Sequence, residues 1–157
     1  MMTISLKSGD KAPEFNSVDQ NGAQIKLSDY KGTKLILYFY PKDNTSGCTA
    51  EACSLRDGYE QLGNLGYDVV GVSPDSEKSH QSFIKKFDLP FRLIADTNQT
   101  VSTLYGVWDE KKMYGRSYMG ILRTTFIIDE KGIITHVISK VNTGDHINQI
   151  LEIIEKP

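Results

Sequence analysis

Cys48 and Cys53 are the residues with the most informative chemistry in this chain of 157 residues. They follow the polar loop that begins at Pro41, and Cys48 lies where this loop is expected to become a helix. The unpaired N–H groups at a helix start favour an anion, so this position stabilises a thiolate. Reactive cysteines at such positions have pKa values lowered to roughly 3.5–7.5. A thiolate there is a nucleophile that can attack a peroxide O–O bond, although a free cysteine is most often a small buried hydrophobe.

The cysteines and histidines of the chain do not have the spacing of a metal site. Two cysteines are too few for a disulfide scaffold, and a close pair in a reducing compartment is more often catalytic or metal-binding. His80, His136 and His146 lie on separate expected elements, without metal-ligand spacing to each other or to the cysteines. We therefore expect neither a metal nor a cofactor. His80 shares a helical face with Phe83 and Phe87 and is interpreted as a half-buried packing residue.

Strands and helices are expected to alternate around the cysteine loop. Residues 35–40 form a continuous apolar run that ends at Pro41, which is typical of a strand buried on both faces. Apolar residues then recur at helical spacing from 52 to 62 and predict one helix. The remaining expected elements are strands at 67–73, 91–94, 123–128 and 133–138, a helix between Ser76 and Pro90, a short helix at 99–105, a long loop at 106–120, and a final helix with an apolar stripe at 147, 150, 151 and 154.

This order predicts an α/β protein with a thioredoxin-like fold, in which helices flank a central mixed sheet. A parallel half is followed by an antiparallel hairpin and a closing helix. Short strands at 15–18 and 25–27, joined by the turn signal Asn21-Gly22, add an N-terminal hairpin, and 106–120 is a mid-chain insertion. Open sheets of this type bind ligands at the carboxyl ends of their strands, and the loop after Tyr40 lies at such an end. We expect residues 1–157 to form one domain.

Composition and charge exclude several classes of partner. The hydrophobic fraction is 39% and the charged fraction 24%, as in ordinary globular proteins. The formal net charge is −2, whereas nucleic acids and anionic membranes require a basic face. No apolar run approaches the length of a membrane span, and the first residues lack a signal-peptide core. We therefore expect a cytoplasmic protein that binds neither nucleic acid nor a membrane.

The cysteine loop resembles the active-site motif of the peroxiredoxins: proline, three residues, threonine, two residues, cysteine. Pro41, Thr45 and Cys48 occupy these positions, although Ser46 stands where many members have proline. The second cysteine five residues later resembles the bacterioferritin comigratory protein, or peroxiredoxin Q, branch. The segments 114–116 and 120–129 resemble the late arginine segment of that branch, so the resemblance covers nearly the whole chain.

This resemblance implies a role for each matched residue. Cys48 would be the peroxidatic nucleophile, oxidised to a sulfenic acid, and Cys53 would resolve that acid to a disulfide. The Thr45 hydroxyl would contact peroxide and thiolate, and Arg123 would stabilise the thiolate and the leaving oxygen. The N–H groups of Cys48 and Thr49 would add donors, and Pro41 would shield the pocket. Without the resemblance, Arg123 is a solvated residue at the start of a strand, and Thr45 is a turn or cap residue.

Glu51, in the first turn of the helix, is expected to serve the helix dipole and is not counted as catalytic. The resemblance further implies a hydroperoxide substrate, thioredoxin or a similar dithiol as reductant, and a monomer. Two other functions were considered. A thiol–disulfide oxidoreductase of the same fold would have Cys-x-x-Cys and a cis-proline before the final hairpin, where this chain has Arg123-Thr124. A non-enzymatic metal-binding or partner-binding module has little support from two cysteines and scattered histidines.

Overall fold

The computed structural model describes residues 5–155, with all of their side chains except that of Met113. No helix in this part of the chain has the length and apolarity needed to cross a membrane. The strands are β1 (Asn16–Val18), β2 (Gln24–Lys26), β3 (Lys34–Phe39), β4 (Tyr67–Ser73), β5 (Arg92–Ala95), β6 (Trp108–Met113), β7 (Arg116–Ile121), β8 (Thr124–Ile128) and β9 (Ile134–Ile138). The helices are α1 (Ser46–Asp57), α2 (Tyr59–Asn64), α3 (Glu77–Phe87), α4 (Thr100–Leu104) and α5 (His146–Glu155), with 3-10 turns at Leu27–Tyr30 and Thr143–Asp145.

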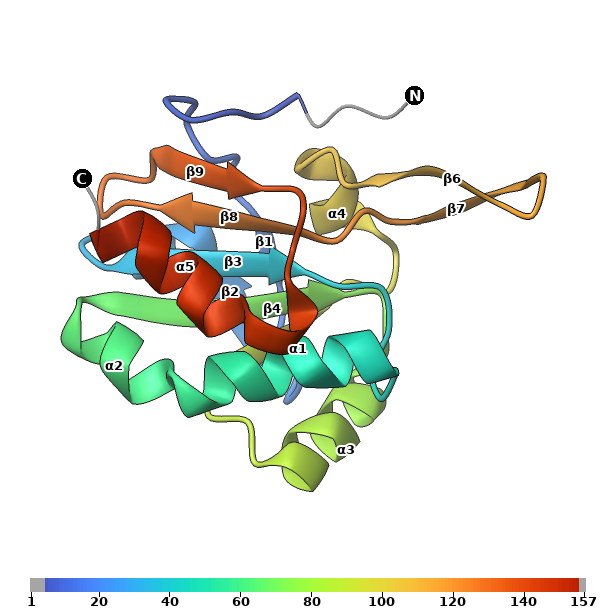
Figure 1. Cartoon of the computed structure of the whole chain (residues 1–157), viewed down its shortest axis with the longest axis horizontal. Helices are drawn as coiled ribbons and strands as arrows, with labels where there is room; N and C mark the ends of the chain where they lie inside the picture. The colour runs from blue at the N-terminus through green and yellow to red at the C-terminus, as the bar shows by residue number, and fades with distance from the viewer. Residues whose placement is uncertain (1–4, 156–157) are drawn as a thin grey trace.

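The central sheet has the strand order β5-β4-β3-β8-β9, with β3 in the middle. β3 pairs in parallel with β4 and antiparallel with β8, so the expected mixed, thioredoxin-like sheet is confirmed. α1 and α5 lie together on one face of this sheet (Figure 1). The carboxyl end of β3 leads directly into the cysteine loop, so a strand buried on both faces sets the position of α1.

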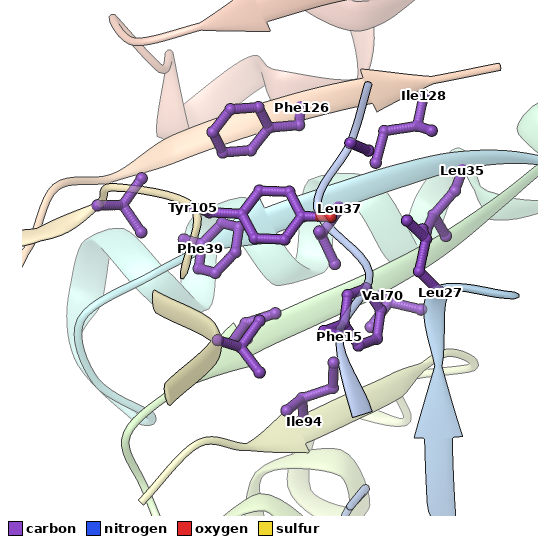
Figure 2. Close-up of a cluster of buried hydrophobic side chains, with 14 of the residues drawn as sticks. Phe15, Leu27, Leu35, Leu37, Phe39, Val70, Ile94, Tyr105, Phe126 and Ile128 are labelled. Atoms are coloured by element: carbon purple, nitrogen blue, oxygen red, sulfur yellow. The ribbon is translucent and has the colours of Figure 1, made fainter. Parts of the chain in front are cut away.

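Two buried clusters hold β3 in place, because alternate side chains of a strand point to opposite faces. Leu35, Leu37 and Phe39 pack on the face away from α1, together with Tyr105 and Phe126 (Figure 2). The other face, which carries Ile36, Tyr38 and Tyr40, packs against α1 in a cluster that includes Cys48, Ala52 and Leu55. The apolar run at 35–40 was therefore correctly interpreted as a strand buried on both faces.

Residues 106–120, expected to be a loop, instead form the antiparallel hairpin β6–β7, which projects from the body of the molecule (Figure 1). The turn residues Tyr114 and Gly115 have φ of 53° and 76°, the positive values of the tight turns that suit hairpins. Both faces of the distal part are exposed, as at Tyr114 and Tyr118. The segment therefore lacks the apolar alternation that would have predicted its strands.

The helix expected over 52–62 is divided into α1 and α2 at Gly58, the only residue between them. A Cβ atom at Gly58 would lie 2.1 Å from Cγ1 of Ile147 in α5. The close approach of α5 therefore explains the glycine at this junction. The N-terminal hairpin β1–β2 is confirmed, whereas the strand expected from residue 123 begins at Thr124 and leaves Arg123 in the short connection from β7.

Candidate active site

Cys48 is buried in the first turn of α1, at the edge of the sheet where β3 ends. Its side chain is 1% exposed, and Nη2 of Arg123 donates to its Sγ over 3.3 Å. Cys48 is the third residue of the helix, so its N–H group is one of those without an intrahelical acceptor. Cys53 lies on the same helix, is half-buried and, like Cys48, is a free thiol. The cation and the helix start together make this a site for a thiolate.

Arg123 contacts both Cys48 and the carboxyl group of Glu51. Its Nη1 atom donates to Oε1 of Glu51 over 2.7 Å, while Nη2 contacts the Cys48 sulfur. Burial opposes the charge of Arg123, but the neighbouring Cys48 and Glu51 outweigh this effect and raise its pKa. A Cβ atom at Gly47 would lie 3.3 Å from Nη2, so glycine leaves room for the guanidinium. The interpretation of Arg123 as a solvated surface residue is therefore wrong.

Glu51 is the main site residue that the sequence analysis missed. It is completely buried and points toward Arg123 rather than serving the helix dipole at the surface. Burial raises the pKa of Glu51 to about 7, although Arg123 acts in the opposite direction. Spacing could have revealed this position, because residues 48, 51, 52 and 55 form one buried stripe of α1.

His146, also not used in the sequence analysis, lies behind Glu51 at the start of α5. It is completely buried, and its Nε2 atom is 2.8 Å from the Thr125 hydroxyl and 3.6 Å from Oε2 of Glu51. Its Nδ1 atom is 2.8 Å from Oε1 of Gln149. Burial lowers the pKa of His146 to about 4, so the imidazole is neutral near pH 7. The structure thus brings together residues from α1, α5 and β8 around one carboxyl group.

Thr45 and Thr49 flank Cys48 at the start of α1, and Pro41 begins the loop that leads to them. Thr45 is the residue before α1, and its hydroxyl donates to the main-chain carbonyl of Lys42 over 2.8 Å, rather than to Cys48. The N–H group of Thr49 donates to the carbonyl of Thr45 over 2.8 Å. The expectation that this N–H is open to substrate is therefore wrong, which leaves the N–H of Cys48. Pro41 is half-buried at the start of the loop.

The buried pair Asp43 and His80 anchors the cysteine loop to the body of the protein. Asp43 accepts hydrogen bonds from the hydroxyls of Tyr40 and Ser79 over 2.6 and 2.8 Å, and lies 2.7 Å from Nδ1 of His80. Nε2 of His80 is 2.9 Å from the carbonyl of Ile94. His80 is therefore fully buried and hydrogen-bonded, not half-buried by packing alone. These bonds hold the loop to α3 and β5.

The mixed sheet and the buried cysteine at the start of α1 define a thioredoxin-fold thiol protein. A model of the AhpC/TSA family matches residues 8–137. A putative peroxiredoxin Bcp of Coxiella burnetii is 48% identical over 148 residues, which cover 94% of this chain and 98% of the relative. Peroxiredoxin Bcp of Bacillus subtilis is 44% identical and covers 98% of this chain and 97% of its own length.

Solved structures agree with these relatives. A cysteine-to-serine mutant of Xylella fastidiosa PrxQ superposes with a TM-score of 0.88 at 32% identity, covering 99% of this chain and 96% of that one. A Xanthomonas campestris bacterioferritin comigratory protein, studied for its alkyl peroxide reduction activity, gives 0.84 at 32% identity and 90% of each chain. The chain therefore belongs to the AhpC/TSA family, and its relatives are peroxiredoxins of the Bcp and Q type.

Proposed function

We propose that this protein is a thiol peroxidase in which Cys48 attacks the hydroperoxide and Arg123 stabilises the reacting charges. The observation that carries this proposal is the 3.3 Å contact between Nη2 of Arg123 and the buried Sγ of Cys48. A guanidinium on the sulfur favours the thiolate. The attack forms an S–O bond, breaks the O–O bond and releases an alkoxide or hydroxide. Arg123 is placed to stabilise the charge that moves from sulfur to the leaving oxygen.

Thr45 and Pro41 complete the pocket. The N–H of Cys48 is available to the peroxide, and Thr45 reaches it when its hydroxyl turns away from the carbonyl of Lys42. Pro41, half-buried at the loop start, shields the sulfur from water. Together these residues would position the peroxide in line with the Cys48 sulfur.

Cys53 resolves the sulfenic acid, but only after α1 opens. On a regular helix, five residues give a rise of about 7.5 Å and a rotation of about 140°, which places the two Cα atoms about 8.7 Å apart. A disulfide tolerates at most about 6.8 Å. Both cysteines lie inside α1, so its first turns must unwind before the bond forms. The opened segment presents the disulfide to a reductant.

The substrate is a hydroperoxide, as the alkyl peroxide reduction reported for the Xanthomonas relative suggests, and the reductant is a dithiol such as thioredoxin. The net charge of −2 supports a protein that binds neither nucleic acid nor anionic membrane. We further propose a cytoplasmic monomer. Residues 1–157 would form one domain, because the two buried clusters on the faces of the central sheet draw on the N-terminal hairpin and on α5.

Peroxide consumption coupled to thioredoxin, thioredoxin reductase and NADPH tests the proposal. Cys48→Ser should abolish consumption. Cys53→Ser should reduce one equivalent of peroxide and then stop. Arg123→Ala should slow the attack by a factor of about 10²–10³, the usual effect of losing one charge-stabilising donor. Activity retained in Cys48→Ser, with circular dichroism showing an intact fold, would refute the assignment of the nucleophile.

A further inference from the structure

Arg123 faces two acids with one positive charge. Its Nη1 and Nη2 atoms contact Glu51 and Cys48 at 2.7 and 3.3 Å, and both acids are almost completely buried. If the carboxyl and the thiol were both ionised, the buried group would carry a net charge of −1. Two acids that share a site resist double ionisation, and such groups titrate as a pair. The site is neutral only when one of the two acids keeps its proton.

The hydrogen bonds behind Glu51 show where that proton is held. The N–H of Asn142 donates to Oε1 of Gln149 over 2.9 Å, and Nε2 of Gln149 donates to the carbonyl of Lys140 over 2.8 Å. These main-chain groups fix the orientation of the amide. Oε1 of Gln149 is thus an acceptor, and Nδ1 of His146, 2.8 Å away, must be the donor. In neutral His146 the lone pair therefore lies on Nε2.

The Nε2 atom of His146 also lies beside Glu51. Nε2 of His146 accepts the Thr125 hydroxyl over 2.8 Å and lies 3.6 Å from Oε2 of Glu51. Oε2 is buried and has no hydrogen-bond partner among the described residues. A carboxylate would leave Oε2 as an unpaired anionic oxygen beside a nitrogen that has no hydrogen to donate, which is costly in the interior. A proton on Glu51, which makes it the neutral acid beside neutral His146, removes the unpaired charge.

We propose that the Glu51–His146 pair holds the proton that Cys48 gives up, so that Arg123 is paired with one anion at a time. Before the attack the anion is the Cys48 thiolate. When the sulfur becomes a neutral sulfenic acid, Arg123 pairs fully with Glu51, and the pair releases its proton. This inference rests on the proposed peroxidase function and makes Glu51 and His146 positioning residues, because they act through Arg123.

The reaction balances with this proton. Thiolate, Cys53 thiol, hydroperoxide and the protonated pair give disulfide, alcohol, water and the deprotonated pair. The two sulfurs lose two electrons, and the peroxide gains them. The Cys53 proton leaves in the water. The leaving alkoxide takes up one further proton, and the Glu51–His146 pair supplies it in place of solvent. Unwinding of α1 then withdraws Glu51 into solvent, whereas His146 remains on α5.

Several groups face Glu51 from the packed elements. Burial raises the pKa of Tyr38 well above its usual value, so its nearby hydroxyl stays neutral. Burial lowers the pKa of Lys111, the β6 lysine whose charge acts on Arg123 and Cys48. Tyr38 on β3, Arg123 before β8 and His146 on α5 lie around Glu51, while Cys48 on α1 and Lys111 on β6 act on Arg123. Within this set, burial brings the pKa of Glu51 to about 7, close to the pH at which the enzyme would work.

Counting protons tests this inference. Reduced protein receives one equivalent of hydrogen peroxide at pH 6.5 without a reductant, in weak buffer with an indicator dye. Wild type should take up close to no proton per disulfide formed, because the pair supplies it. Glu51→Gln should take up one proton per disulfide, because an amide cannot release one. Glu60→Gln, which removes an exposed acid of α2, is the matched control and should behave as wild type.

Uptake of one proton per disulfide in wild type would overturn the proposal. If Glu51→Gln does not fold, infrared difference spectra of wild type decide the question. Oxidation should remove the C=O band of a protonated carboxylic acid, and a spectrum in which this band is not lost would also overturn it. These outcomes differ from a failure of the proposed function, in which one equivalent of peroxide would form no Cys48–Cys53 disulfide.

Discussion

Replacing Glu51 or His146 should change the pH dependence of folding stability in opposite directions. Burial raises the pKa of Glu51 from its ordinary 4.5 to about 7 in the folded protein. The contribution of Glu51 to stability is therefore fully present below pH 4.5 and is lost as the pH rises to about 7. At 1.36 kcal/mol for each pKa unit, this loss is about 3 kcal/mol.

His146 has the opposite sign. Burial lowers its pKa from 6.5 to about 4, so its contribution is fully present above pH 6.5 and is lost as the pH falls to about 4, again by about 3 kcal/mol. Between pH 4.5 and 6.5 the folded pair binds one proton at Glu51, and the unfolded pair binds one proton at His146. The two effects cancel, and the pair adds almost no slope to the wild-type curve.

Urea unfolding of the reduced protein, measured at half-unit steps from pH 4 to pH 8, tests this cancellation. Relative to wild type, Glu51→Gln should gain about 3 kcal/mol of stability as the pH rises from 4 to 6.5, because only His146 remains. His146→Gln should lose about 3 kcal/mol between pH 4.5 and 7. Glu60→Gln should run parallel to wild type. Parallel curves for all three variants would refute the idea that two opposed buried groups compensate each other.

Three further predictions follow from the packing of α1 and the cysteine loop. Hydrogen exchange should show that the amides of residues 49–53 lose protection about a thousandfold on oxidation. Opening of α1 breaks about four helical hydrogen bonds, which together are worth about 4 kcal/mol. Unchanged protection would mean that α1 stays closed. Gly58→Ala should destabilise the protein by about 1–3 kcal/mol through its clash with α5, whereas Gly63→Ala, with open space around it, should be neutral or stabilising in the same denaturation assay. Asp43→Asn should cost about 1–3 kcal/mol, since an amide cannot accept all the hydrogen bonds that buried Asp43 makes with Tyr40, Ser79 and His80, and a loss below about 0.5 kcal/mol would show that these bonds do not anchor the loop.

Much of the fold could be predicted because its strongest signals are local. The apolar run that forms β3 needs burial on both faces, and Asn21-Gly22 provides a turn that only a few residue types allow. The β6–β7 hairpin carries no such signal, because its exposed faces do not alternate. The break at Gly58 was also missed, since its cause is a side chain of α5, almost ninety residues away in the sequence.

The sequence pointed to Cys48 as the proposed nucleophile and to Arg123, but not to Glu51 and His146 beside them. Cys48 was found from its place at a helix start, and Arg123 from the resemblance to peroxiredoxins; the structure then brought Arg123 to the sulfur. Glu51 resembled an ordinary first-turn acid, and His146 an isolated histidine. Their roles depend on α1, α5 and β8 meeting around one buried carboxyl, and this meeting is a property of tertiary packing that no spacing within one element reveals.

The placement of Cys48, Glu51 and Cys53 on one helix couples the chemistry to the opening of α1. Near its C-terminal end, α1 is held by contacts that do not depend on charge, such as the bond from the N–H of Ile147 to the Ser54 hydroxyl, 3.0 Å long. Its N-terminal turns are held by Arg123, and one of the two bonds of Arg123 ends on the Cys48 sulfur. In the proposed reaction, oxidation removes the charge on that sulfur, so the bond from Arg123 to Cys48 is lost while the bond to Glu51 remains. The helix should therefore open from Cys48 toward Cys53, and only after the peroxide has reacted.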